Sequence, residues 1–351
     1  MDSLGHVTVL GGGAFGTAMA QHLAAIKGTK VKMWVLEADV VESINTRHEN
    51  KFLGGVRLHE SITATGSVDE AVADAEMILL IIPTPFIGKW VEQNQTKLPW
   101  KVPIVCCSKG IEQSTLRTPY EILVDELPGK FHDSLAVVSG PSFAKEVAAG
   151  LPTNVTCAAS NPECARKVQS ALSTQIFRVY TGSDIIGAEL CGAVKNVLAI
   201  ACGTSDGLGF GANARAGLIT RGLAEMARLV VKKGGRTSTV TGLAGVGDLV
   251  LTCSSSLSRN FTVGKGLAEG KAPDAGSAVA EGVETSRAIY NLAQELGVDM
   301  PVCTAVFRVL HEGRFVKEAL AELQNRPLRS EDDDIFATEC ADPPQKRLKT
   351  S

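Results

Sequence analysis

Short apolar runs recur along the first half of the chain, separated by segments with helical periodicity. The runs cover residues 6–10, 31–36, 77–82, 103–107, 135–139, 153–158 and 176–180. Several of them are apolar with little alternation, which is typical of strands covered on both faces. Strands that alternate with helices favour right-handed βαβ units and a mostly parallel sheet. The pattern therefore predicts an α/β domain over residues 1–183, in which Ser67 and Glu70 form a capping box at the start of one helix.

From residue 184 onward the pattern becomes purely helical. Prolines are absent from 163–272, and the stretches 216–233 and 286–297 place apolar residues at helical spacing. We therefore predict a C-terminal all-helical domain over 184–329. Residues 330–351 are polar and charged, which predicts a disordered tail.

Composition narrows the class of protein. The 351 residues are 44% apolar, which is enough for large cores, and the formal net charge of -3 with 5% aromatics disfavours a nucleic-acid binder. The longest apolar run near residue 80 is Met77–Ile82, so we expect no membrane span, and the N-terminus lacks the pattern of a secretory signal. The nine cysteines include no C-x-x-C pair, which predicts reduced, buried thiols. Together these features predict a cytoplasmic protein.

A glycine-rich motif follows the first predicted strand and opens a helical pattern. It reads Gly11-Gly12-Gly13-Ala14-Phe15-Gly16. In a dinucleotide site the first glycine permits a tight turn, the second lets the backbone approach the pyrophosphate, and the third lets the helix lie close to its strand. The free N–H groups of the helix then bind the anion. The motif alone is also compatible with an ordinary glycine turn, but its flanking elements favour a Rossmann-like doubly wound sheet that binds a dinucleotide.

Glu37 lies near the end of the second predicted strand, 21 residues after Gly16. An acidic residue at this distance accepts the ribose hydroxyls and repels a 2′-phosphate. No arginine occurs within 35–42, so the sequence favours NAD over NADP. The alternative is an exposed loop glutamate.

Lys195 lies in the apolar segment 184–203, whose other charged residues are Asp184 and Glu189. Such a helix is expected to be buried, and a buried lysine needs a partner or a chemical role. Desolvation lowers the pKa of a lysine toward the range in which it exchanges protons near neutral pH. The alternative is a lysine whose ammonium reaches the surface.

Two further glycine-rich segments follow. Segment 205–216 has alternating glycines, which suit a backbone that surrounds a small ligand. Segment 242–264 contains Asp248, which can orient the Lys195 ammonium, as well as Thr252, Arg259 and Asn260. Arg259 can hold a phosphate in a bidentate way, and Asn260 can add a neutral donor. Taken alone, each of these residues is better explained as a solvated loop residue.

Taken in order, a series of motifs resembles NAD-dependent glycerol-3-phosphate dehydrogenases. The motifs are GGGAFGTA, CSKGIE, GPSFAKEVA, CGAVKNVLAIACG, SDGLGFGANARAGLITRGLAEM, GLAGVGDLVLTCSSSLSRN and AEGVETSRAIY, and they cover roughly residues 5–328. The resemblance implies an enzyme that interconverts sn-glycerol 3-phosphate and dihydroxyacetone phosphate with NAD, needs no metal and forms a homodimer.

The resemblance also implies roles for particular residues. Lys195 would be the acid/base, and Lys109, Asp248, Thr252 and Asn196 would complete the reaction centre. The SRN motif would make Arg259 and Asn260 the substrate-phosphate site, with Arg259 also near the cofactor pyrophosphate. The residues lining the cofactor cleft would be Phe86, Ala144 and Glu281, and at the last position animal members have Gln.

Two alternatives remain at this stage. One is a Rossmann-fold hydroxyacid dehydrogenase with a Lys-x-x-x-Asn helix, although here the residue four positions after Lys195 is Ala199. The other is a non-catalytic NAD-binding sensor, although Lys195, Lys109 and Arg259 are all present.

Overall fold

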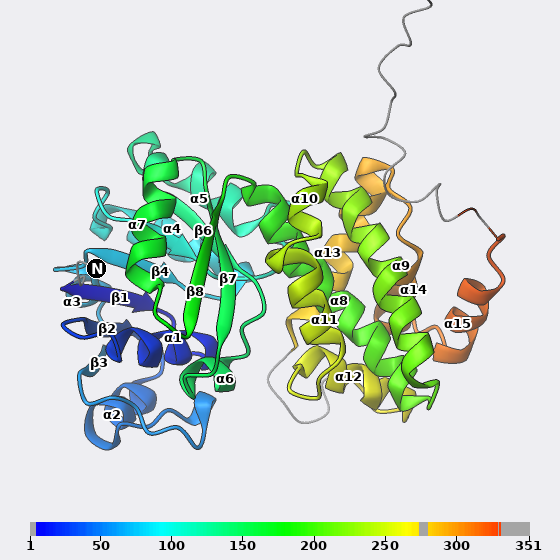
Figure 1. Ribbon diagram of the computed structural model, residues 1–351, viewed down its shortest axis with the longest axis horizontal. Helices are drawn as coiled ribbons and strands as arrows, with labels where there is room; N and C mark the ends of the chain where they lie inside the picture. Colours follow the sequence, from blue (N-terminus) through cyan, green and yellow to red (C-terminus); the bar gives the residue numbers. More distant parts are fainter. Residues whose placement is uncertain (1–4, 274–279, 329, 331–351) are drawn as a thin grey trace, which may run out of the picture.

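The computed structural model describes residues 5–273, 280–328 and 330, and shows a sheet domain beside a helical domain (Figure 1). The predicted tail, apart from Ser330, lies outside the described residues. The strands are β1 (His6–Leu10), β2 (Lys30–Trp34), β3 (Ile62–Thr65), β4 (Met77–Leu80), β5 (Ile104–Cys106), β6 (Leu135–Ser139), β7 (Thr153–Ala159) and β8 (Phe177–Gly182).

These strands form one sheet in the order β3-β2-β1-β4-β5-β6-β7-β8. The first six strands in this order form five parallel pairs, the β6–β7 pair is antiparallel, and the β7–β8 pair is parallel, so the predicted mostly parallel sheet is confirmed. The order 3-2-1-4-5-6 is that of dinucleotide-binding folds. Strand β3 was not predicted, because its sequence ITAT is short and half polar and contains no apolar run.

Helices cover both faces of the sheet (Figure 1). They are α1 (Ala14–Ala24), α2 (Ala38–Arg47), α3 (Val68–Val72), α4 (Thr84–Asn94), α5 (Pro119–Glu126), α6 (Ala144–Ala148) and α7 (Pro162–Leu172). Successive residues of β4 alternate between two cores: Met77 and Leu79 pack with α1, α2, α6 and α7, whereas Ile78 and Leu80 pack with α3, α4 and α5. Burial on both faces explains the apolar runs.

The capping box predicted at residues 67 and 70 is only half present. The Ser67 side chain accepts from the Glu70 N–H at 3.3 Å, which caps α3. The carboxylate of Glu70 instead accepts from the Thr65 hydroxyl at 2.7 Å, because β3 places that hydroxyl within reach.

The helical domain is built around one long central helix, α8 (Ile185–Gly207). The remaining helices are α9 (Gly211–Lys232), α10 (Thr237–Val240), α11 (Asp248–Cys253), α12 (Arg259–Ala268), α13 (Glu281–Leu296), α14 (Pro301–His311) and α15 (Val316–Gln324), with a π-helical turn over Leu243–Gly247. By length and composition α8 could cross a membrane, so the expectation that no such segment exists was wrong. Of its most apolar window 89% is buried inside the protein, which makes α8 the core helix of this domain.

The glycine-rich segment 205–216, which the sequence predicts to surround a small ligand, lies at the end of α8 away from Lys195. It completes α8, turns and begins α9, and Gly209 and Gly211 supply the left-handed backbone of that turn with φ of +76° and +78°. Gly207 lies twelve residues beyond Lys195, which at a rise of about 1.5 Å per residue is about 18 Å along the helix.

Candidate functional site

A buried polar cluster lies where α8 and α11 meet the loop after β5. Lys195 on α8 is 6% exposed, so its predicted burial is confirmed. Its ammonium donates to the Thr252 hydroxyl at 3.0 Å and to the Asn196 side-chain oxygen at 3.1 Å, and lies 3.3 Å from Asp248 Oδ1. Side chains of two helices, α8 and α11, therefore converge on one ammonium group.

Asp248 holds two ammonium groups at once. Its Oδ2 accepts from Lys109 Nζ at 2.6 Å, while its Oδ1 faces Lys195 and accepts from the Thr252 hydroxyl at 3.2 Å. The Asp248 side chain is 2% exposed, and the Lys109 side chain is 19% exposed. Lys109 and Lys195 thus place two ammonium groups at one site, which suits a substrate that develops negative charge during reaction.

Burial is the largest cause of a lowered pKa at Lys195. Lys109 lowers this pKa further by charge repulsion, whereas the carboxylates of Asp248 and Glu281 raise it. The direction agrees with the expectation from the sequence, since a lowered pKa moves Lys195 toward the range in which it exchanges protons near neutral pH.

The starts of α12 and α13 meet α8 beside this cluster. Asn196 Nδ2 donates to Glu281 Oε2 at 3.4 Å, and the Gly282 N–H donates to Asn260 Oδ1 at 2.9 Å. A Cβ at Gly282 would lie 2.7 Å from the Asn196 carbonyl oxygen, so only glycine permits this approach. Asn260 is therefore buried in a structural contact through its oxygen.

Arg259, the first residue of α12, is exposed. Within the described residues its guanidinium forms no hydrogen bond or ion pair. It directly precedes Asn260 in the chain, and among the described residues no hydrogen bond or ion pair joins it to Lys195.

The glycine-rich turn between β1 and α1 fits a dinucleotide. Gly11 has φ of +130°, and a Cβ there would lie 2.3 Å from the Ile81 carbonyl oxygen. A Cβ at Gly16 would meet the Gly11 carbonyl oxygen at 2.1 Å, whereas one at Gly13 would project into open space. Gly13 is the N-cap of α1, and no side chain caps that helix. Its first N–H groups are thus available to an anion.

The other predicted cofactor residues are spread along the sheet domain. Glu37 immediately precedes α2, Phe86 lies in the first turn of α4 and is 63% exposed, and Ala144 begins α6. None of these three forms a hydrogen bond or ion pair with the Lys195 cluster among the described residues. They follow β2, β4 and β6, whose parallel arrangement brings their carboxyl ends to one edge of the sheet.

The sequence did not predict the contacts that the Lys109 side chain makes with backbone at two glycines. The carbonyl of Gly140 accepts from Lys109 Nζ at 3.4 Å, and the Lys109 stem lies against Gly192 on α8, where a Cβ would be in ordinary van der Waals contact at 3.5 Å from Lys109 Cγ. Gly140 lies in the motif GPSFAKEVA and Gly192 in the motif CGAVKNVLAIACG, but neither motif shows that its glycine adjoins Lys109.

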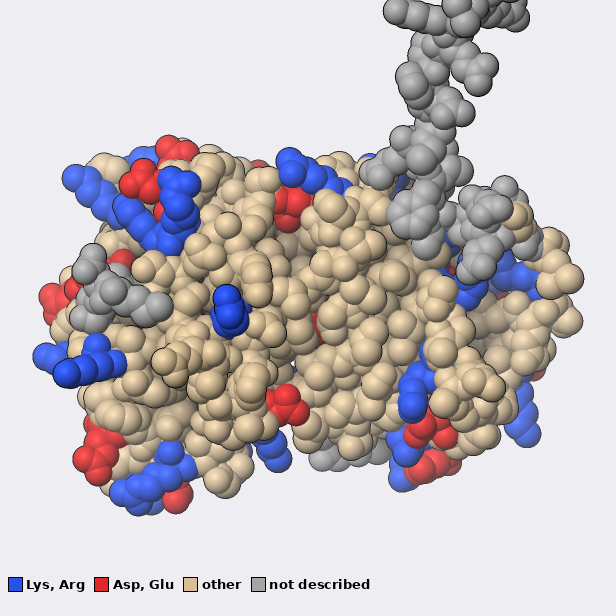
Figure 2. Space-filling model, viewed as in Figure 1, with Lys and Arg blue, Asp and Glu red and all other residues tan. Residues whose placement is uncertain are grey.

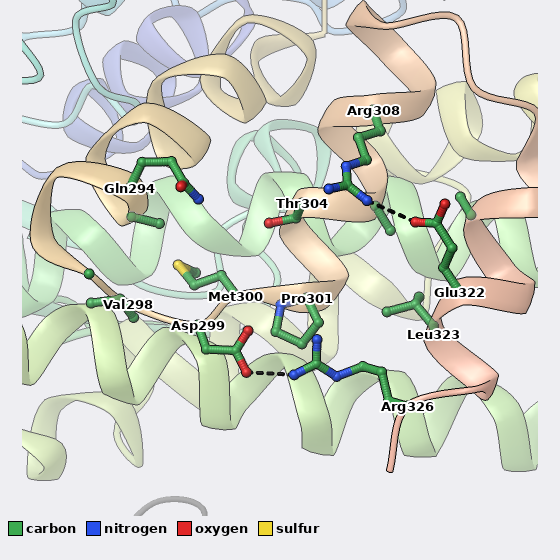
Figure 3. A pocket seen from close by; sticks show the side chains of 14 residues that line it. Gln294, Val298, Asp299, Met300, Pro301, Thr304, Arg308, Glu322, Leu323 and Arg326 are labelled. Atoms are coloured by element: carbon green, nitrogen blue, oxygen red, sulfur yellow. Dashed lines mark hydrogen bonds and ion pairs between the residues drawn. The ribbon is translucent and has the colours of Figure 1, made fainter.

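A cavity of about 380 Å³ lies away from this cluster, between α13, α14 and α15 (Figure 3). Two ion pairs border it, Arg308 with Glu322 at 2.8 Å and Arg326 with Asp299 at 2.6 Å. None of its lining residues belongs to the predicted site. No group of metal-binding side chains occurs among the described residues.

The fold and the cluster together define a two-domain nicotinamide-dependent dehydrogenase. Models of the N- and C-terminal domains of NAD-dependent glycerol-3-phosphate dehydrogenase match residues 6–165 and 184–321. The chain belongs to this family.

Individual relatives agree with that assignment. The chain is 50% identical to glycerol-3-phosphate dehydrogenase [NAD(P)+] of Anaeromyxobacter sp. (strain K) over 329 residues, which cover 92% of this chain and 99% of the relative. The enzyme of that name from Nitratidesulfovibrio vulgaris is 49% identical over 330 residues, with coverage of 93% and 99%. The crystal structure of glycerol-3-phosphate dehydrogenase from Coxiella burnetii matches with a TM-score of 0.85 and 39% identity, covering 92% of this chain and 99% of that one.

Proposed function

We propose that this NAD-dependent glycerol-3-phosphate oxidoreductase uses Lys195 as its general acid and base. The observation that carries the proposal is the contact of one buried, pKa-lowered ammonium with Asp248, Thr252 and Asn196. The reaction interconverts sn-glycerol 3-phosphate and dihydroxyacetone phosphate. In the reductive direction Lys195 donates a proton to the ketone oxygen, and in the oxidative direction it accepts the proton of the alcohol. Such help contributes roughly 10²–10⁴-fold to the rate.

The other members of the cluster orient Lys195 and stabilise charge. Lys109 supplies positive charge where the alkoxide develops, and Asp248 holds both ammonium groups in place. Thr252 and Asn196 accept hydrogen bonds from Lys195 and thereby fix the position of its ammonium group.

Bound NAD supplies the hydride exchange. The residues that would hold it are the turn Gly11, Gly12, Gly13, Ala14, Phe15 and Gly16, together with Glu37, Phe86, Lys109, Ala144, Arg259 and Glu281. Two observations support the fit of this turn to the NAD pyrophosphate: no side chain caps the N-terminus of α1, and the space beside Gly13 is open.

We place the substrate phosphate at Arg259 and Asn260. Arg259 is exposed and forms no ion pair within the described part of the chain, so its guanidinium is available to a phosphate. A fixed phosphate orients the carbonyl toward Lys195, which lowers the entropic part of the barrier.

Several finer properties also belong to this proposal. We propose the domains 1–183 and 184–329, a cytoplasmic homodimer, and no partnership with nucleic acid or membrane. On the face seen in Figure 2, basic and acidic side chains lie in small mixed groups rather than in one basic patch. We also propose a preference for NAD over NADP through Glu37, although relatives are named for both cofactors.

The phosphate assignment is tested by pairing an enzyme variant with a substrate change. Arg259→Ala should raise KM for dihydroxyacetone phosphate steeply, because the contact exists in both the ground and transition states. Unphosphorylated dihydroxyacetone should be a poor substrate for the parent enzyme and little worse for the variant. Lys265→Ala, on the same helix and 44% exposed, is the matched control. Equal impairment of both substrates by Arg259→Ala would show that Arg259 does not bind the phosphate.

A further inference from the structure

The loop that carries Lys109 is anchored in both domains. It leaves the sheet after β5 and returns to it at α5. At its start the Ser108 hydroxyl donates to the Ile82 carbonyl at 2.5 Å, and the Thr84 hydroxyl donates to the Lys109 carbonyl at 3.2 Å. The backbone of Lys109 is therefore held by the sheet domain.

The residues after Lys109 pack against the helical domain. Ile111 is 3% exposed and is part of the core formed by α8, α9, α11, α13 and α14, and Leu116 packs against the same core. Gln113 adds a hydrogen bond from Nε2 to the Glu284 carbonyl on α13 at 3.4 Å. A segment between two elements of the sheet domain thus inserts its apolar side chains into the helical domain.

The loop closes on itself between these anchors. The Glu112 N–H donates to the Arg117 carbonyl, and the Leu116 N–H donates to the Glu112 carbonyl, each at 2.9 Å. Leu116 adopts φ of +57°, a conformation that costs a branched residue energy and persists only when surrounding contacts enforce it. The loop is therefore a closed, constrained unit rather than a flexible connection.

We propose that Ile111 is a positioning residue, whose insertion into the helical core holds the Lys109 ammonium against Asp248. This inference rests on the proposed role of Lys109 in the reaction. Lys109 comes from the sheet domain, whereas Asp248 lies on α11 of the helical domain. The 2.6 Å distance between Lys109 Nζ and Asp248 Oδ2 therefore depends on how the two domains are joined. Ile111, two residues from Lys109, is the buried side chain of the loop that makes this junction.

The test compares the same side-chain truncation, Ile to Ala, at two positions in the core of the helical domain. Ile111→Ala removes the anchor, and Ile289→Ala removes the same atoms from α13, where Ile289 is 0% exposed in the same core. Both variants should lose thermal stability, because both create a cavity. Only Ile111→Ala should lower kcat, by about 10²-fold as expected for a reacting group displaced by about 1 Å, with NADH affinity unchanged.

The pH profile of kcat provides a readout that lost stability does not change. The charged or titratable side chains that face Lys195 are Asp248 and Cys253 on α11, Lys109 on this loop and Glu281 on α13. Of these, Lys109 lowers the pKa of Lys195 by charge repulsion. Displacing Lys109 therefore raises the pKa of Lys195. The loss of reductive activity at high pH should shift upward in Ile111→Ala and in Lys109→Met, and should not shift in Ile289→Ala.

The outcomes separate this inference from the proposed function. If Lys109→Met lowers kcat while Ile111→Ala and Ile289→Ala share one kcat and one pH profile, Ile111 does not position Lys109. If Lys109→Met itself keeps kcat and its pH profile, the proposed role of Lys109 fails, and the inference fails with it. Should the alanine variants not fold, Ile111→Val and Ile289→Val are compared in the same way, with a smaller shift in the same direction expected.

Discussion

Replacing Asp248 by Asn tests whether one carboxylate holds the reaction centre together. The change keeps the shape of the side chain but removes the charge that faces Lys195 at 3.3 Å and Lys109 at 2.6 Å. Coulomb's law gives about 5 kcal/mol for charges about 3.3 Å apart at an effective dielectric constant of about 20. Breaking a buried ion pair by removing one partner typically costs about 3–5 kcal/mol. We therefore expect a loss of Tm on the order of 10 °C.

The same change should alter the pH dependence in a defined direction. Asp248 raises the pKa of Lys195, so Asp248→Asn lowers it further below its usual value. Only protonated Lys195 can donate a proton, and the reductive kcat should therefore begin to fall at a lower pH than in the parent enzyme. Stability should show the linked effect. A lysine whose pKa is lowered on folding releases its proton before the unfolded chain does, so stability rises with pH through that window. The variant's loss of Tm should accordingly shrink as the pH is raised.

The assays are thermal unfolding across a pH series and NADH oxidation followed at 340 nm. Asp39→Asn is the matched control for Tm, because Asp39 also lies 2.6 Å from a lysine, Lys51, but is 67% exposed. A solvated pair of this kind contributes little, so no measurable change in Tm is expected. An Asp248→Asn enzyme with the parent Tm and the parent pH profile would refute the idea that Asp248 holds the two lysines.

Three further predictions address other parts of the proposal. Lys195→Ala should lower kcat and kcat/KM together by roughly 10²–10⁴-fold with NADH affinity nearly unchanged, and a normal kcat would move the proton-donor role to Lys109 as the next candidate. Glu37→Arg should shift kcat/KM toward NADPH, whereas comparable values for both cofactors in the parent enzyme would contradict the NAD preference. Truncation after residue 330 should leave kcat intact, because the removed segment has few apolar side chains to bury, and loss of most activity would show otherwise.

The sequence by itself determined the features that depend on neighbouring residues. Seven of the eight strands follow from apolar runs, since a strand covered on both faces needs them. The burial of Lys195 follows from a helix that is apolar on every side, and the turn at Gly11 follows from glycines between a strand and a helix. Strand β3 escaped this reasoning because it is short and half polar.

Only the tertiary structure decided which distant groups meet. Lys109 and Asp248 are 139 positions apart, and their contact requires the loop after β5 to enter the helical domain. The glycines of 205–216 form the turn between α8 and α9, and α8 is buried although its length and composition would suit a membrane. A local pattern records what each segment needs to bury, whereas the partner that covers it depends on packing between segments far apart in the chain.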